Sequence, residues 1–329
     1  HRKRIDLPIP TANLTDFPEK VPIVADADIG AVCRADGFDI RFTAADGTTL
    51  LSYERESFAV AGGEATGIFW VKTSVSTAGT YVWCYYGNPS ATDGEDAEAV
   101  WDDDFKAVYH MNDATTSTIL DSTGNGNNGA KKGANEPIEA DGKIAKGQDF
   151  DGANDCIEIG HAGFMDTSTP YTLEAWFKSE GIGAAQVLIC KNEASTSYPQ
   201  YFLGWDGNTF YFQHATAFHG IEYLPWAALN IGTIDGNWHY VCGVWDDVLD
   251  KIYIYLDGAP VTSVNVATGY AYADANGHAL GKSAPAWGYP FDGLQDEVRI
   301  SSIARSAAWI AYEYANMNPA DGGLTWGAE

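Results

Sequence analysis

Two Phe-Asp-Gly turns in this sequence carry several side chains that could bind a metal ion. One turn opens the segment FDGANDCIEIG at Phe150, and the other opens FDGLQDEVRI at Phe291. Calcium takes about six to eight oxygens from carboxylates and backbone carbonyls, which acidic turns supply. The sequence therefore predicts a structural calcium site among Asp151, Asn154, Asp155, Asp292 and Asp296. The alternative is that these side chains only accept hydrogen bonds within Asx-type turns.

Carboxylate pairs for sugar hydrolysis are missing from the strand-like runs. A retaining glycosidase needs two carboxylates about 5 Å apart, which on a strand means acids at alternate positions. Glu174 has no acidic neighbour two positions away, Asp296 and Glu297 are adjacent, and Glu222 is an isolated acid in a loop. The sequence also lacks zinc spacing around its loop histidines, a nucleophile elbow, a phosphate-binding loop and a dinucleotide fingerprint. The pattern favours a non-catalytic protein, with a hydrolase or lyase site dispersed over loops as the alternative.

Aromatic residues in two loops form a candidate sugar-binding site. One loop is HATAFHGIEYLPWAALN, from His214, and the other is SAPAWGYPFDG, from Ser283. Aromatic rings stack on the apolar face of a sugar, while nearby polar groups bind its hydroxyls. The candidate ligand-binding residues are Trp226, Trp287, Tyr289, Tyr223 and His219. The alternative is that these rings only cap the ends of the sheets.

The charge balance excludes one class of partner. The chain of 329 residues has 45 acidic and 19 basic side chains, a net charge of −26. Phosphate backbones would repel so acidic a chain, so we expect no nucleic-acid partner. No apolar run approaches the length of a membrane span, so we expect no membrane insertion.

The five cysteines have no metal-ligand spacing. Three of them, Cys84, Cys156 and Cys242, lie in strand-like runs, so we expect buried, reduced side chains. A Cys33–Cys84 disulfide is left open as the alternative.

The element pattern predicts two all-β domains. Before residue 100, runs such as RIDLPIP, IFWVK and TYVWCYY alternate as strands do, and no helical period is present. The small, acidic segment 90–98 is typical of a linker, so we expect a β-sandwich-like domain at 1–98 and a second domain at 101–329. In the second domain, the strands that begin with the two Phe-Asp-Gly turns are expected to pair. One late helix is predicted over Ala304–Met317, where apolar residues recur at helical spacing.

The first domain resembles the domain-of-unknown-function 2341 family. The motifs that carry this resemblance follow one another over nearly all of residues 1–110: LTDFPEKVPIV, GFDIRFTAADGTTLLSYERESF, IFWVK, YVWCYYGNPSA and VWDDDFKAVYHM. Such domains occur in bacterial surface proteins and in proteins of phages and other mobile elements, often directly before a jelly roll. The resemblance implies no catalytic residues.

The second domain resembles the LamG-type, concanavalin A-like lectin/glucanase jelly rolls. The resemblance is carried by DSTGNGNNG, FDGANDCIEIG, YTLEAWFKS, GNWHYVCGVWDD, IYIYLDGAPV and FDGLQDEVRISSIARS. These jelly rolls often hold calcium where the first and last strands meet, through a carboxylate of the last strand and carbonyls of a Gly-containing turn. By that resemblance the ligands would be the Asp296 side chain and the Gly152 carbonyl, with Asp151 as a weaker candidate.

These features together predict a non-catalytic adhesion or carbohydrate-recognition module of a larger surface or phage-tail protein. We expect a glycan or cell-surface polysaccharide as partner, and an extracellular, cell-surface or virion location. Further domains of a larger chain or a homo-oligomeric assembly are expected as additional partners. A polysaccharide hydrolase or lyase and a purely structural spacer remain the alternatives, because the jelly-roll fold hosts lectins, adhesion modules and hydrolases alike.

Overall fold

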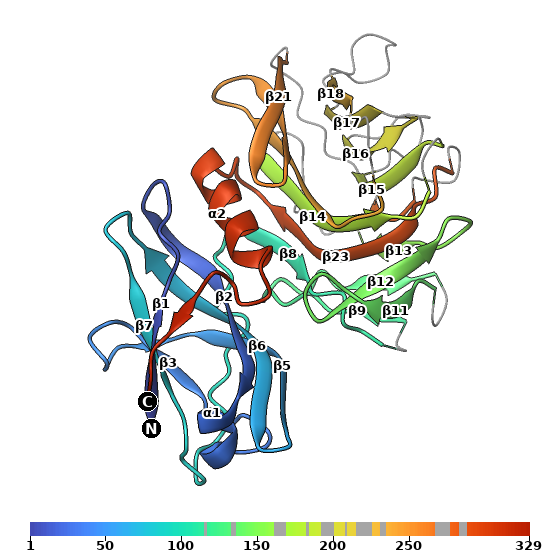
Figure 1. The fold of residues 1–329 in the computed structure, drawn as a ribbon. Helices are drawn as coiled ribbons and strands as arrows, with labels where there is room; N and C mark the ends of the chain where they lie inside the picture. The colour runs from blue at the N-terminus through green and yellow to red at the C-terminus, as the bar shows by residue number, and fades with distance from the viewer. Residues whose placement is uncertain are drawn as a thin grey trace. The chain divides into compact units, whose positions relative to one another are not determined.

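The computed structural model describes most of the chain as two compact units. The described residues are 1–114, 117–132, 136–160, 169–181, 184–191, 201–207, 209–214, 226–230, 235–266, 277–282 and 288–329; of 226, 229 and 230 only the backbone is described. The first unit comprises His1–Asp103 with Ala311–Glu329, and the second comprises Asp104–Ile310. Both are built almost entirely of antiparallel strands, which confirms the expected all-β class (Figure 1).

The first unit holds a five-stranded and a three-stranded antiparallel sheet. Their strand orders are β24-β1-β7-β3-β4 and β2-β6-β5. Phe42 and Phe69, one from each sheet, are fully buried, and their ring centroids lie 5.4 Å apart in an edge-on contact. The strands are β1 (Arg2–Asp6), β2 (Leu14–Asp26), β3 (Arg41–Thr43), β4 (Leu50–Leu51), β5 (Tyr53–Ala61), β6 (Glu64–Val75), β7 (Tyr81–Tyr85) and β24 (Thr325–Trp326).

Turn and proline signals were reliable in this unit. The Ala45–Thr48 turn lies between β3 and β4, which pair as expected. Pro18 and Pro22 lie in β2, which is an edge strand where missing N–H donors are tolerated. The expectation of no helix before residue 100 was wrong, because a short helix of six residues, α1 (Ala27–Val32), follows β2. Asp26 caps this helix by accepting a hydrogen bond from the Ile29 N–H at 3.0 Å.

The unit boundary differs from the expected one at the C-terminus. The structure divides after Asp103, near the expected linker, but residues 311–329 join the first unit instead of the second. Strand β24 pairs with β1, with Trp326 opposite Ile5. The late helix is present as α2 (Ala307–Met317), and the buried Lys20 donates to the carbonyls of Met317 and Pro319, both at 2.9 Å. A two-residue strand has no periodicity, so sequence pattern could not indicate which sheet it joins.

The second unit is a jelly roll of two antiparallel sheets. The β16 sheet has the order β18-β17-β16-β15-β22-β13-β10-β9, and the β23 sheet has the order β11-β12-β23-β14-β19-β20-β21, with β8 also paired to β23. The core between them takes side chains from both, including Phe177 and Val241 from the β23 sheet and Leu203 and Phe210 from the β16 sheet. The strands are β8 (Phe105–Tyr109), β9 (Thr118–Ile119), β10 (Gly129–Lys131), β11 (Ile138–Asp141), β12 (Lys146–Asp151), β13 (Ile157–Ile159), β14 (Tyr171–Ser179), β15 (Gln186–Lys191), β16 (Tyr201–Asp206), β17 (Thr209–His214), β18 (Trp226–Asn230), β19 (His239–Asp246), β20 (Lys251–Leu256), β21 (Ala259–Asn265), β22 (His278–Leu280) and β23 (Asp292–Ser301).

The two Phe-Asp-Gly segments lie side by side, but the strand expected to begin at the first turn does not pair with β23: β13, which follows that turn, pairs with β10 and β22 in the other sheet. Strand β12 pairs with β23, with Phe150 opposite Gly293, and the Gly152 N–H donates to the Phe291 carbonyl at 3.0 Å. The rings of Phe150 and Phe291 meet in the core at a centroid distance of 5.6 Å. The first Phe-Asp-Gly motif thus ends β12 instead of opening a strand, and it is this preceding strand that pairs with β23.

Candidate functional site

A small apolar patch covers part of the outer face of the β16 sheet. Its buried centre consists of Val187, Cys190 and Ala279. Their strand neighbours, such as Leu188 and Leu280, belong to the core between the sheets, so alternation directs the patch outward. Three partly buried side chains pack on this centre, and we call the whole set the outer patch: Cys156, Phe202 and Tyr289.

Tyr289 was predicted as a ligand-binding residue, and its place on the outer patch is fixed by the backbone. The residue has a φ of 29°, and its carbonyl accepts a hydrogen bond from the Val187 N–H at 3.1 Å. The following Phe291 N–H donates to the Gly281 carbonyl at 2.8 Å. The backbone of Tyr289 is thus hydrogen-bonded to β15, and Phe291 to the residue after β22.

Phe202 is the residue of this patch that sequence reasoning missed. In the run YFLGW, alternation sends Tyr201 and Leu203 into the core and Phe202 to the opposite face, where a polar residue is usual. A Cβ added to Gly204 would lie 3.0 Å from the Phe202 ring, so the glycine leaves room for the ring above the strand. An aromatic residue on the outward face of an alternating strand was the signal available in the sequence.

The other four predicted ligand-binding residues cannot be placed in the patch. Trp226 begins β18, where it pairs with Gln213, but its side chain is outside the described part of the chain. Trp287, Tyr223 and His219 lie outside the described residues altogether. The predicted site is therefore represented in the structure by Tyr289.

The chemistry of the outer patch is that of a binding surface. Burial raises the pKa of the Cys156 thiol to about 11, so this thiol is protonated at neutral pH and is a poor nucleophile. The Cys190 sulfur donates to the Lys282 carbonyl at 3.4 Å. The partly exposed rings of Phe202 and Tyr289 offer flat apolar surfaces of the kind that stack on sugars.

The predicted calcium ligands are not brought together in one place. The β12–β23 register sets Gln295, the residue before Asp296, opposite Gln148, which is four positions from Gly152 and so roughly 13 Å away along the strand. The Asp296 carboxylate accepts hydrogen bonds from the N–H groups of Ile144 and Glu297, both at 2.7 Å. Asp296 and Gly152 therefore do not fit a single ion.

The turn around Asp151 has the hydrogen bonds of the alternative interpretation. The Asp151 carboxylate accepts from the N–H groups of Ala153 at 2.8 Å and Asn154 at 3.2 Å. The Asp155 carboxylate in turn accepts from the Asp151 N–H at 3.0 Å. These are bonds of the Asx-turn type.

Two buried glutamates of the β23 sheet are hydrogen-bonded to other side chains. Glu174 accepts a hydrogen bond from the Tyr240 hydroxyl at 3.1 Å. Glu297 lies between the His110 imidazole and the Arg299 guanidinium, each at 2.7 Å. Burial alone would raise the pKa of Glu297, but the charges of His110 and Arg299 hold it below its usual value. Glu297 is thereby kept ionised as a structural group, which does not suit a general acid.

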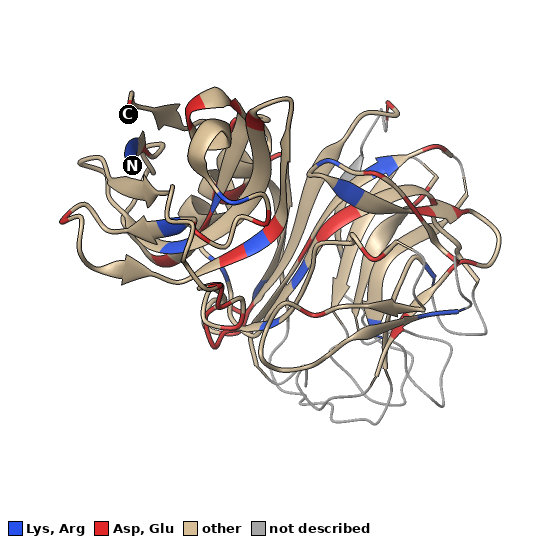
Figure 2. Cartoon of the chain, turned by 90° about the horizontal axis from the view of Figure 1, so that it is seen from below, with Lys and Arg blue, Asp and Glu red and all other residues tan. Residues whose placement is uncertain are grey.

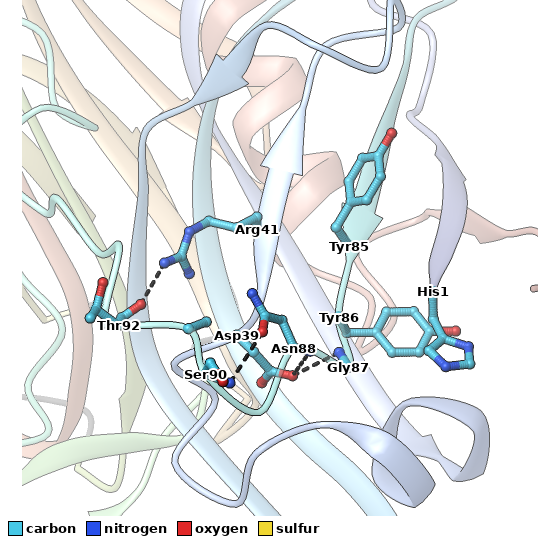
Figure 3. A pocket seen from close by; sticks show the side chains of 10 residues that line it. His1, Asp39, Arg41, Tyr85, Tyr86, Gly87, Asn88, Ser90 and Thr92 are labelled. Carbon is cyan, nitrogen blue, oxygen red and sulfur yellow. Dashed lines mark hydrogen bonds between the residues drawn. The ribbon is translucent and has the colours of Figure 1, made fainter.

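The first unit contains a separate polar pocket. Its volume is about 570 Å³, and it lies between the start of β3 and the segment that follows β7 (Figure 3). Arg41, Asp39 and Tyr86 are among its lining residues, and none of them was singled out from the sequence. The pocket is described further below.

Acidic residues dominate the surface charge. Figure 2 shows Asp and Glu positions, in red, spread over strands and loops of both units, in keeping with the net charge of −26. All five cysteines are free, so the Cys33–Cys84 disulfide is not formed. Neither described helix has the length and apolar character that a membrane span requires.

Comparison with known families agrees with the architecture of both units. Residues 151–311 match the concanavalin A-like lectin/glucanases superfamily. Residues 36–128 match domain of unknown function 2341. Both resemblances expected from sequence motifs are confirmed, and the jelly-roll unit has a lectin-like fold. No curated protein matches the chain.

Solved structures resemble the chain at the level of fold. Domain 4 of AbnA, a GH43 extracellular arabinanase from Geobacillus stearothermophilus solved with arabinotriose, is 24% identical with a TM-score of 0.49, over 64% of this chain and 98% of that domain. The botulinum neurotoxin serotype G binding domain is 11% identical with a TM-score of 0.50, over 64% of this chain and 50% of its own length. The match thus spans about half of that toxin domain. At these identities the likenesses concern the fold alone.

Proposed function

We propose that this chain is a non-catalytic carbohydrate-recognition protein that acts outside the cell. The observation that carries this proposal is the match of residues 151–311 to a superfamily of lectins and glucanases. The outer patch supports it, because Phe202 and Tyr289 present partly exposed rings on a rigid sheet. In this proposal a sugar stacks on these rings, and Trp226, Trp287, Tyr223 and His219 extend the site. Display on a cell surface or on a phage particle, as part of a larger assembly, belongs to the same proposal.

A glycan array probed with the intact chain tests this function. We expect selective binding to one glycan class and no release of reducing ends from the polysaccharides that bind. Release of reducing ends would establish the hydrolase alternative instead. The absence of binding to any glycan at millimolar concentrations would favour a structural spacer.

Removing the patch rings should weaken glycan binding without unfolding the protein. A stacking contact contributes about 1 kcal/mol, so Phe202→Ala and Tyr289→Ala are each expected to raise Kd by about fivefold. Titration calorimetry with the glycan found on the array measures this change. The control is Tyr253→Ala, which removes a partly exposed ring from β20 in the other sheet. Equal affinities for the patch variants and the control would contradict the proposed site.

A structural calcium ion remains a prediction from family resemblance. Because Asp296 and Gly152 lie apart, an ion would need other oxygens than the predicted pair. Binding of an ion to the folded state alone would raise the melting temperature by mass action. Melting scans with calcium and with chelator, together with elemental analysis, decide the matter. An unchanged midpoint without bound metal would exclude the ion.

A further inference from the structure

The pocket of the first unit has the size of a small-molecule site. Its volume of about 570 Å³ lies within the range of roughly 300–1,000 Å³ that is usual for ligand pockets. Arg41, the first residue of β3, forms one side (Figure 3). Tyr86 and the segment Gly87–Thr92, which follows β7, form much of the rest.

The Arg41 guanidinium is held in place by neutral oxygens. Its Nη1 donates to the carbonyls of Phe38 at 2.8 Å and Ile40 at 2.7 Å and to the Tyr53 hydroxyl at 3.0 Å. Its Nη2 donates to the Thr92 carbonyl at 2.6 Å. A Cβ on Gly94 would lie 2.3 Å from Cζ, so this glycine allows the backbone to pack closely against the guanidinium. Arg41 is therefore fixed before any ligand arrives.

The hydrogen-bond acceptors around Arg41 are neutral. Within the part of the chain that the structure describes, its hydrogen bonds go to carbonyls and one phenol, and no carboxylate lies within ion-pair distance. The carboxylate in the pocket wall, Asp39, is 3% exposed and accepts from three N–H groups: Arg34 at 2.9 Å, Gly87 at 2.7 Å and Asn88 at 3.1 Å. Asp39 thus fixes the shape of the wall.

The segment after β7 offers groups that suit a hydroxylated ring. The Asn88 side-chain oxygen accepts from the Ser90 N–H at 3.1 Å, which fixes the amide at the pocket wall. The side chains of Ser90 and Thr92 line the pocket as well. The Tyr86 ring, 3% exposed, supplies an apolar surface and stacks on His1 at a centroid distance of 5.7 Å.

We propose that this pocket binds a small sugar acid that carries a single carboxylate, of the uronic acid class. The carboxylate pairs with Arg41, since a guanidinium with neutral partners retains an unpaired charge and planar N–H donors for a carboxylate. The ring hydroxyls bond to Asn88, Ser90 and Thr92. A single negative charge is favoured over a polyanion, because Asp39 and the net charge of −26 repel further negative charge. This site is independent of the outer patch, so a negative binding result for one site does not contradict the other.

Titration calorimetry of the intact chain with glucuronate, glucose and inorganic phosphate tests the proposal. We expect saturable binding of glucuronate, with glucose and phosphate each at least tenfold weaker. Glucose equal to glucuronate would overturn the role of the charge. Phosphate equal to glucuronate would overturn the sugar acid as ligand.

Three variants connect the binding to this pocket. Arg41→Gln is expected to weaken glucuronate binding at least tenfold, whereas Arg4→Gln, which removes an exposed arginine paired with Asp6, should leave it unchanged. Because Arg41 also holds nearby loops, Ser90→Trp serves as a second variant that fills the pocket from its exposed rim. Folding of each variant is checked by its melting curve. Wild-type affinity in a folded Ser90→Trp variant would overturn the proposal.

Discussion

Raising the pH from about 5 to about 9 is expected to destabilise the first unit by up to about 5 kcal/mol through Glu19 alone. This side chain is fully buried, and burial raises its pKa to about 8. The Tyr312 hydroxyl donates to it at 2.9 Å and the Asn316 amide at 2.7 Å, and the neighbouring Lys20 charge partly offsets the rise.

Stability falls with rising pH because the folded and unfolded states bind different numbers of protons. Between the unfolded pKa of about 4.5 and the folded pKa of about 8, the folded state holds a proton on Glu19 that the unfolded state has lost. The stabilisation is complete below the unfolded value and is lost as the pH rises through the folded value. Above that pH the native state carries a buried carboxylate, and stability stops falling on this account.

Glu19→Gln provides the matched control for this pH effect. Glutamine has nearly the same shape and stays neutral, so the variant should lose the steep part of the pH dependence and become more stable than the wild type at pH 9. Hydrogen exchange of β2 and β6 amides, measured by mass spectrometry against pH, reports on this unit specifically. Parallel pH profiles for the two proteins would show that Glu19 is not the titrating group.

Asn316→Ala is expected to cost the first unit about 3 kcal/mol, because the side chain connects α2 to two other segments. Its amide donates to Glu19 at 2.7 Å, to the Lys20 carbonyl at 3.2 Å and to the Gly322 carbonyl at 3.3 Å. Its oxygen accepts from the Lys20 N–H at 2.8 Å. Alanine would leave these buried groups without their partner, and buried polar groups without partners are costly.

The neighbouring Asn318 supplies the control, because it is exposed and bonds to the Tyr314 hydroxyl at 3.2 Å on the same helix. Asn318→Ala should change the free energy of unfolding by less than about 0.5 kcal/mol. Urea unfolding of the wild type, Asn316→Ala and Asn318→Ala, monitored by hydrogen exchange in β2, gives both changes in the free energy of unfolding. Similar losses for the two variants would mean that the buried contacts of Asn316 do not explain the effect.

The candidate sites were accessible from the sequence to different degrees. The aromatic residues of the second domain were found as a class, but Phe202 was overlooked because its run was taken only as a strand. The calcium set combined Asp296 with Gly152, although the register of β12 against β23 separates them. The Arg41 pocket depends on residues from β3 and from the segment after β7, which lie far apart in the sequence. No local sequence pattern indicates that β3 and the segment after β7 lie together.

The sequence by itself determined the all-β class and the late helix. These features depend on alternation, turn residues and helical spacing, which act over a few residues and are visible in a single chain. Only the tertiary structure decided that residues 311–329 complete the first unit, that Asp296 lies apart from Gly152, and that Arg41 lines a pocket with no carboxylate partner among the described residues. Each of these depends on contacts between distant segments, whose register and burial are set by packing of the whole domain and not by local preference.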